Sequence, residues 1–314
     1  MYKNLTKIST LNMSHDEWLE HRQKSIGGSD AASIIGLNPF SSPYTVWADK
    51  LGKLPPKEDS EAMRQGRDLE FYVAQRFCEA TGKKVRRENN ILINPDYPFA
   101  HANVDRMIVG EDAGLECKTT STLNLKKFKN GAFPDTYYVQ CVHYMMVTGC
   151  KKWYLAVLVL GKEFMFFEIE RDEEEIAALA KSEAEFWNLV ERQRAPETDG
   201  AASTTNTISI LYPESDDDFG SVNLFAYDSE LQQFLALSGQ IKELERLRDE
   251  MANKVKAFLG DAPIGESDSY KVSWKSASRS TFDSKRFATE HPEVDLSKYY
   301  KNSTYRTFKV TEKI

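Results

Sequence analysis

The sequence lacks any stretch of about 18 apolar residues, so it predicts no membrane-spanning helix. Residues 1–10 also lack the apolar run of a secretory signal, and both absences favour a cytosolic protein. CxxC, HxH and HxxxH pairs are missing too, which argues against a structural zinc site or an iron–sulfur cluster. We therefore expect His101 and His143 to be structural, and the cysteines to be free thiols in or near a core: Cys78, Cys117, Cys141 and Cys150.

An excess of positive charge is also missing, because the 314 residues carry a net charge of −7. This balance counts only weakly against a nucleic-acid partner, since local patches set the electrostatic field at a groove. Carboxylates that hold a metal also add acid where cations bind. With 41% hydrophobic residues, the composition is that of an ordinary globular protein, long enough for one large domain and a smaller one.

Apolar periodicity and capping residues predict a series of helices and strands along the first two thirds of the chain. The predicted helices are 15–23, 31–35, 43–51, 60–81, 135–148 and 172–193. The predicted strands are 85–93, 101–109, 113–119, 153–160 and 163–170. This order predicts an α/β fold with a mixed central sheet flanked by helices.

The C-terminal third has a different character. Ser229 and Gln232 predict a capping box for a helix that runs to about Gly260, with an apolar spacing near 3.5 that favours a helical hairpin or coiled-coil contact. Residues 270–274 and 305–310 are candidate strands, and residues 269–314 carry a net charge of +5. We therefore predict a main domain over 1–195, a linker over 196–222, and an accessory region with a long helix and a small β appendage over 223–314.

Three side chains in the predicted strands carry the chemistry. Glu116 and Lys118 are two residues apart and project from one face, whereas Cys117 points the other way. Asp105 lies on the preceding predicted strand and approaches Glu116 if the two strands form a hairpin. Two carboxylates, with the Cys117 carbonyl as a third oxygen, suit Mg²⁺ or Mn²⁺. The lysine can orient or deprotonate the attacking water, or neutralise the charge that develops on the phosphate. The alternative is a surface hairpin with a cross-strand ion pair worth under about 1 kcal/mol.

A second cluster suits an anion. Gly27 and Gly28 precede Ser29 at the start of a predicted helix, where free backbone N–H groups attract phosphate. Arg22 offers a guanidinium that can pair bidentately with such a phosphate. The alternative is that Ser29 or Asp30 simply caps the helix, and a phosphate would require Asp30 to point away.

Four blocks in order, within about residues 14–195, resemble the PD-(D/E)xK nuclease superfamily and, within it, the YqaJ-type viral recombinase nucleases related to phage lambda exonuclease. The first block runs from Trp18 and Arg22 through Ile26-Gly27-Gly28-Ser29-Asp30 to Asn38-Pro39-Phe40. The others are Gly66 with Leu69-Glu70, Asp105 with Leu115-Glu116-Cys117-Lys118-Thr119-Thr120, and Gln140 with Tyr144 and Thr148-Gly149. The departure is Val104, where the superfamily name has proline.

The resemblance implies a restriction-endonuclease-like core and a role for each matching residue. Asp105 and Glu116 would be metal ligands, and Lys118 the catalytic lysine. Glu70 would reach the metal site directly or through water, and the equivalent of Gln140 lines the active site in the family.

Three further matching residues are candidates for DNA contact: Arg22, Ser29 and Tyr144. Arg22 and Ser29 would bind the 5′-terminal phosphate. For Tyr144, packing and DNA contact both remain open, since it lies one helical turn from Gln140.

The resemblance further implies an Mg²⁺-dependent 5′→3′ double-stranded DNA exonuclease of phage or prophage recombination, with Mn²⁺ as a possible substitute. It would act in the cytoplasm of a bacterial host and produce 3′ single strands for a phage single-strand annealing protein. Relatives form closed rings, which implies a trimer or tetramer. The alternatives are an endonuclease of the same superfamily and a non-catalytic DNA-binding accessory protein of recombination.

Overall fold

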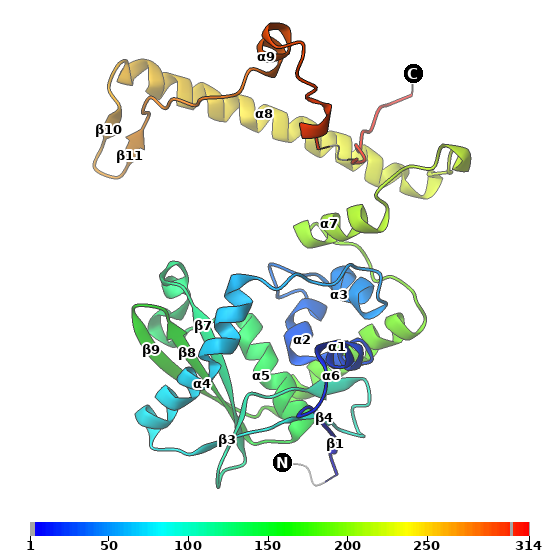
Figure 1. Cartoon of the computed structure of the whole chain (residues 1–314), viewed down its shortest axis with the longest axis vertical. Helices are drawn as coiled ribbons and strands as arrows, with labels where there is room; N and C mark the ends of the chain where they lie inside the picture. Colours follow the sequence, from blue (N-terminus) through cyan, green and yellow to red (C-terminus); the bar gives the residue numbers. More distant parts are fainter. Residues whose placement is uncertain (1–3, 302–303, 314) are drawn as a thin grey trace. The chain divides into compact units, whose positions relative to one another are not determined.

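Helices and strands alternate through the first two thirds of the computed structural model, which describes residues 4–301 and 304–313 (Figure 1). The chain divides into two units, Met1–Tyr212 and Pro213–Ile314. The four cysteines are free thiols, buried or half-buried, as expected. Among the described residues, no helix is long and apolar enough to cross a membrane.

The helices of the first unit begin and end where local signals predict. Helix α1 (His15–Gln23) starts at Ser14, whose hydroxyl accepts a hydrogen bond from the amide of Glu17 in a capping box. Helix α4 (Glu61–Thr81) stops at Gly82, which adopts φ +70°. The others are α2 (Gly28–Ile34), α3 (Pro43–Lys50), α5 (Asp135–Thr148), α6 (Glu173–Glu191), α7 (Ala202–Leu211) and the 3-10 helix η1 (Thr122–Gly131).

A five-stranded mixed sheet forms the centre of this unit, in the order β3-β6-β7-β8-β9. Strands β7 and β8 run parallel, and the other neighbours run antiparallel. Its strands are β3 (Val85–Arg87), β6 (Arg106–Ile108), β7 (Ala113–Thr120), β8 (Lys152–Val159) and β9 (Glu163–Glu170). A second sheet has the order β1-β4-β5-β2, with β1 (Thr6–Ser9), β4 (Asn90–Ile93), β5 (Ala100–Ala102) and β2 (Ile26–Gly27).

Alternate residues of β8 pack on opposite sides of the five-stranded sheet. Trp153 and Leu155 are fully buried in the core that includes α5. Tyr154 belongs to the core beneath α4, where its ring centroid lies 5.2 Å from that of Phe77. Helices α4 and α5 therefore cover the two faces, which confirms the predicted α/β core with a mixed central sheet (Figure 1).

Two strands that were predicted to be continuous are each broken in two. The segment 85–93 forms β3 and β4, the segment 101–109 forms β5 and β6, and the halves lie in different sheets. Polar residues stand between the halves: Glu88-Asn89 in the first and Asn103 in the second. The breaks carry the chain from one sheet to the other, and the second break leaves Asp105 directly before β6.

Helix α7 lies within the segment 196–222, which was predicted to be a linker. Two buried threonines hold it against α3. The hydroxyl of Thr204 donates to Ser42 Oγ at 2.7 Å, and those of Thr207 and Thr45 are 2.9 Å apart. The serine- and threonine-rich composition of this segment suggested a loop. The partners that hold the helix in place, Ser42 and Thr45, are distant in sequence, so no local pattern indicated them. The division into functional domains stays a prediction.

The second unit contains the long helix and the small β appendage that the sequence predicts. Helix α8 (Asp228–Leu259) is followed by β10 (Ile264–Glu266), which pairs antiparallel with β11 (Lys271–Ser273). The predicted capping box is wrong, because α8 begins before Ser229 and its N-cap makes no side-chain hydrogen bond. The apolar seam of α8 is exposed in this chain, so the coiled-coil contact stays a prediction.

The remaining elements of the second unit are short. The strand predicted over 305–310 is wrong, since no described strand of the unit pairs with those residues. The short helices are η2 (Asp217–Phe219), η3 (Phe225–Tyr227), α9 (Ser284–Glu290) and η4 (Ser297–Tyr299).

Strand β7 depends on one glycine for its packing, and this predicts a large effect on stability. A Cβ at Gly114 would lie 2.2 Å from the indole of Trp153, its partner on β8, which is fully buried. We expect Gly114→Ala to lower the free energy of unfolding by about 1–3 kcal/mol or more, measured by urea denaturation. Gly66→Ala is the control: nothing lies within 3.9 Å of its Cβ, and alanine favours helix α4 by up to about 1 kcal/mol. Equal effects of the two substitutions would contradict this reasoning.

Candidate active site

Strand β7 presents a buried carboxylate and an ammonium side by side. Glu116 is 3% exposed, and its Oε1 lies 2.6 Å from Nζ of Lys118. The two residues face one side of the sheet because they are two apart on the strand, as the sequence predicts. The alternative interpretation was an ion pair on the surface of a hairpin, but Glu116 is buried. Burial of a carboxylate is costly without a partner, and Lys118 is that partner.

Asp105 joins this pair from the start of β6. The register pairs Arg106 with Leu115, which brings Asp105 alongside Glu116. The backbone N–H of Cys117 donates to Asp105 Oδ2 at 2.8 Å. Burial, and then the nearby carboxylates of Glu116 and Glu70, raise the pKa of Asp105 well above its ordinary value. A second negative charge beside Glu116 is therefore unfavourable here, and Lys118 can neutralise only one of the two carboxylates.

Gln140 on α5 connects these groups. Its side-chain Oε1 accepts a hydrogen bond from Lys118 Nζ at 2.9 Å, and its Nε2 donates to Glu116 Oε1 at 2.9 Å. The same Nε2 donates to the hydroxyl of Tyr144 at 2.7 Å. This arrangement holds both charged groups in place, so the predicted site residue Gln140 lies with the trio.

Tyr144 is buried beside Gln140, one helical turn away on α5. It is 5% exposed, and its ring centroid lies 5.2 Å from that of Trp153. A Cβ added at Gly28 would lie 2.6 Å from the Tyr144 ring and 3.2 Å from Cγ of Gln140. Of the two roles left open for Tyr144, its burial favours packing, and the DNA contact stays a prediction.

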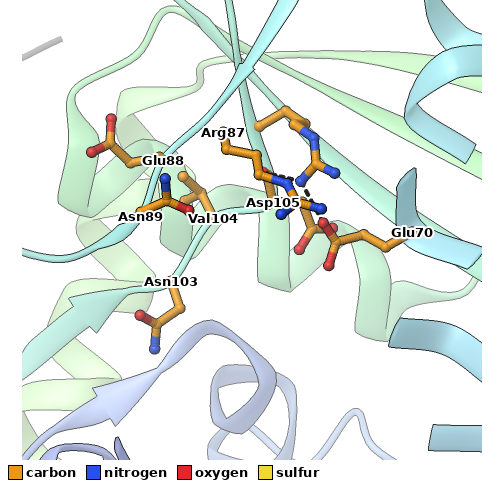
Figure 2. Close-up of a pocket in the computed structure, with 8 residues that line it drawn as sticks. Glu70, Arg87, Glu88, Asn89, Asn103, Val104 and Asp105 are labelled. Atoms are coloured by element: carbon orange, nitrogen blue, oxygen red, sulfur yellow. Dashed lines mark hydrogen bonds and ion pairs between the residues drawn. The ribbon is translucent and has the colours of Figure 1, made fainter. Parts of the chain in front are cut away.

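Glu70 reaches the edge of the trio from α4. Its carboxylate forms an ion pair with the guanidinium of Arg106, whose Nη1 also donates to the carbonyl of Asp105. Figure 2 shows the side chains of Glu70 and Asp105 directed toward one another. Both residues line a cavity of about 270 Å³. Sequence reasoning missed Arg106, although a charged residue within an apolar predicted strand was a visible signal.

A divalent cation fits the donor set of this trio. Oε2 of Glu116 is buried and has no hydrogen-bond partner among the described residues. That oxygen and the carboxylate of Asp105 are hard anionic ligands of the kind that Mg²⁺ prefers. No cluster of three His, Cys, Asp or Glu side chains suited to a metal occurs in the described part of the chain. The Cys117 carbonyl as third ligand and the nearby Glu70 therefore stay predictions.

Lys118 stays charged in this setting. Burial alone would lower its pKa, but Glu116, through charge and a hydrogen bond, and then Asp105 raise it above its ordinary value. Its Nζ also lies 5.3 Å from the ring centroid of Tyr137. As an ammonium, Lys118 can donate a hydrogen bond to a negatively charged group, whereas it cannot accept a proton from the attacking water.

Arg22 and Ser29 also come together. Nη2 of Arg22 donates to Ser29 Oγ at 2.9 Å, and its guanidinium lies 4.9 Å from the ring centroid of Trp18. Ser29 is exposed at the start of α2, one residue from the Gly28 that packs on Gln140. The predicted phosphate-binding pair therefore lies next to the residue that supports the trio.

Asp30 does not oppose an anion at that position, because cations surround it. Its Oδ2 lies 2.7 Å from Nζ of Lys50 and accepts the backbone N–H of Gly27 at 3.0 Å. Lys50 and Arg22 overcome the effect of burial and lower the pKa of Asp30. Sequence reasoning missed Lys50, although it lies three residues after the core residue Trp47 on one face of α3.

His101 and His143 are structural, as expected. Nδ1 of His143 lies 2.7 Å from Glu183, and its Nε2 lies 2.9 Å from the carbonyl of His101. Burial alone would lower the pKa of His143, but Glu183 raises it overall. His101 bonds to Ser25 at 2.8 Å, and burial, with Lys50 and Arg22, lowers the pKa of His101 to about 3.

The lowered pKa of His101 predicts a pH dependence of stability. Below its ordinary pKa of 6.5 the unfolded chain takes up a proton that the folded chain does not, so acid favours unfolding. We expect this residue to cost about 1.4 kcal/mol per pH unit between roughly pH 5 and pH 6. His101→Gln should remove that part of the slope in denaturation experiments. An unchanged slope in His101→Gln would contradict the assignment.

Comparison with known proteins gives one match over nearly the whole chain and others over parts of it. Residues 17–151 match the YqaJ-like viral recombinase domain. The uncharacterized protein YqaJ of Bacillus subtilis is 42% identical over 305 residues, which cover 96% of this chain and 95% of that protein. A protein of African swine fever virus is 33% identical over 69 residues, which cover 21% of this chain and 20% of that protein.

A solved structure has a similar fold although its sequence is only 20% identical to that of this chain. The crystal structure of an alkaline exonuclease from Laribacter hongkongensis has a TM-score of 0.50 and 20% identity, and the match covers 57% of this chain and 93% of that one. The architecture of the first unit is therefore that of an exonuclease fold. Together with the long match to the Bacillus protein, this places the chain in the family of YqaJ-like viral recombinases.

Proposed function

We propose that this protein is an Mg²⁺-dependent nuclease that hydrolyses DNA phosphodiesters at Asp105, Glu116 and Lys118. The observation that carries the proposal is the unpartnered Oε2 of Glu116, which lies beside a second carboxylate and a charged lysine. Two buried carboxyl groups side by side are unfavourable without a cation, so the protein keeps them at a cost to stability. Strongly perturbed groups of this kind concentrate at functional sites.

Each residue has a role that follows from its contacts. Asp105 and Glu116 would hold the cation, which when bound supplies charge stabilisation and a lowered pKa for the attacking water. The ammonium of Lys118 would donate to a phosphate oxygen as negative charge develops. Gln140 positions Lys118 and Glu116 through its two hydrogen bonds.

We further propose that the enzyme degrades linear duplex from the 5′ end. Arg22 and Ser29 support this, because a terminal phosphate fits a guanidinium beside an exposed hydroxyl at a helix start. The product would be 3′ single strands for a phage single-strand annealing protein, in the cytoplasm of a bacterial host. A ring of three or four copies would provide processivity; mass photometry that finds only monomers would exclude it.

The test compares linear and covalently closed circular duplex, with Mg²⁺ and with EDTA. We expect the wild-type protein to degrade only the linear DNA, only with Mg²⁺, and Lys118→Ala to lose this activity. Cleavage of the closed circle would favour an endonuclease over an exonuclease. Equal behaviour of wild type and Lys118→Ala would overturn catalysis at this site and leave a DNA-binding protein.

A further inference from the structure

The segment between β7 and α5 is positively charged in a chain that is acidic overall. No Asp or Glu occurs between Glu116 and Asp135, whereas four lysines do: Lys118, Lys126, Lys127 and Lys129. The last three lie on η1, which begins two residues after β7 ends. This basic segment therefore connects β7, which carries Glu116 and Lys118, to α5, which carries Gln140.

A buried aromatic residue holds η1 close to the site. Phe128 is 7% exposed, and its ring centroid lies 6.4 Å from that of Tyr137 and 6.5 Å from that of Phe167. Tyr137 is also the residue whose ring lies 5.3 Å from Nζ of Lys118. Asn124 adds a hydrogen bond of 3.1 Å to Thr120 at the end of β7. The segment is thus attached at the edge of the site.

The charges of η1 face solvent without partners. Lys126, Lys127 and Lys129 are exposed, and none forms an ion pair with any residue that the structure describes. Some other lysines of this unit are neutralised: Lys83 pairs with Glu111, and Lys152 pairs with Glu168. An uncompensated basic patch attracts polyanions, because each contact releases counterions from the polymer.

We propose that η1 is a binding surface for the sugar-phosphate backbone of duplex DNA, which it holds next to the catalytic trio through Lys126, Lys127 and Lys129. The proposal rests on the proposed nuclease function and adds the surface that retains the polymer. Phosphate contacts of this kind set position and affinity without regard to sequence. This surface explains how a protein with a net charge of −7 binds a polyanion: the positive charge is concentrated where the substrate passes.

The experiment measures binding of a short linear duplex in EDTA, so that no cleavage is required, across a series of salt concentrations. The variant is Lys126→Gln/Lys127→Gln/Lys129→Gln. Each lost phosphate contact reduces the slope of log K against log salt by about 0.9, so we expect a reduction of about 2.7. Affinity at low salt should fall accordingly, with no dependence on base sequence.

The chain offers a control with the same change in charge. Lys84, Lys151 and Lys181 are exposed, and Lys181 lies 3.9 Å from Glu185 on the surface of α6. Lys84 and Lys151 lie at the opposite end of the sheet, where β7 and β8 begin. Replacement of these three by glutamine should leave the slope unchanged. Thermal unfolding should show that both triple variants remain folded.

Two results would overturn the proposal. One is a salt slope that is equal in the η1 variant and the wild type, and the other is an equal reduction in the control. Neither bears on the nuclease itself, which is tested by Mg²⁺-dependent degradation in the wild type. Conversely, a wild-type protein without nuclease activity but with the expected change in slope would refute the proposed function and retain the binding surface.

Discussion

Asp105→Asn is expected to reduce Mg²⁺-dependent degradation of linear duplex by about 10²–10³-fold or more, and at the same time to raise the thermal stability of the metal-free protein. Activity falls because one of two anionic ligands is lost. Stability rises because burial and the carboxylates of Glu116 and Glu70 disfavour the charged form of Asp105. Asparagine keeps an oxygen that can accept the N–H of Cys117.

The measurements are initial rates of degradation and the unfolding temperature, each with and without Mg²⁺. Mg²⁺ should raise the unfolding temperature of the wild type more than that of Asp105→Asn, because a ligand stabilises only the state that binds it. Asp68→Asn is the control, since Asp68 is an exposed residue of α4 whose side chain is 68% exposed. A fully active Asp105→Asn, or one that is less stable than wild type without metal, would refute this account.

Arg22→Gln is expected to remove the preference for a 5′-phosphate. A hydrogen bond to a charged group contributes about 1.5–3 kcal/mol, so kcat/KM for 5′-phosphorylated duplex should fall about ten- to hundredfold. Duplex with a 5′-hydroxyl should be affected much less. The fold should survive, because Lys50 still pairs with Asp30.

The measurement is end-labelled digestion of the two substrates in parallel. Arg192→Gln is the matched control, an exposed arginine at the end of α6. If Arg22→Gln lowered the rate equally on both substrates, Arg22 would support the structure of the site without recognising the terminal phosphate.

Much of the fold was predictable because it depends on local signals. The bounds of α1 follow from a capping box at Ser14, and those of α4 and α5 from glycines that adopt positive φ, Gly82 and Gly149. Buried strand β8 is recognisable as a nearly continuous apolar run. In contrast, the breaks within 85–93 and 101–109 were not predictable, because they reflect a change of partner sheet.

For the site, the spacing of two residues determined that Glu116 and Lys118 share one face of a strand. The resemblance to the nuclease superfamily then joined Asp105 to them. Only the tertiary structure decided which charges neutralise one another. Arg106 with Glu70, Lys50 with Asp30, and the burial of Tyr144 all depend on contacts between elements far apart in the chain. Desolvation and pairing of buried charges are set by such long-range packing, which no local pattern encodes.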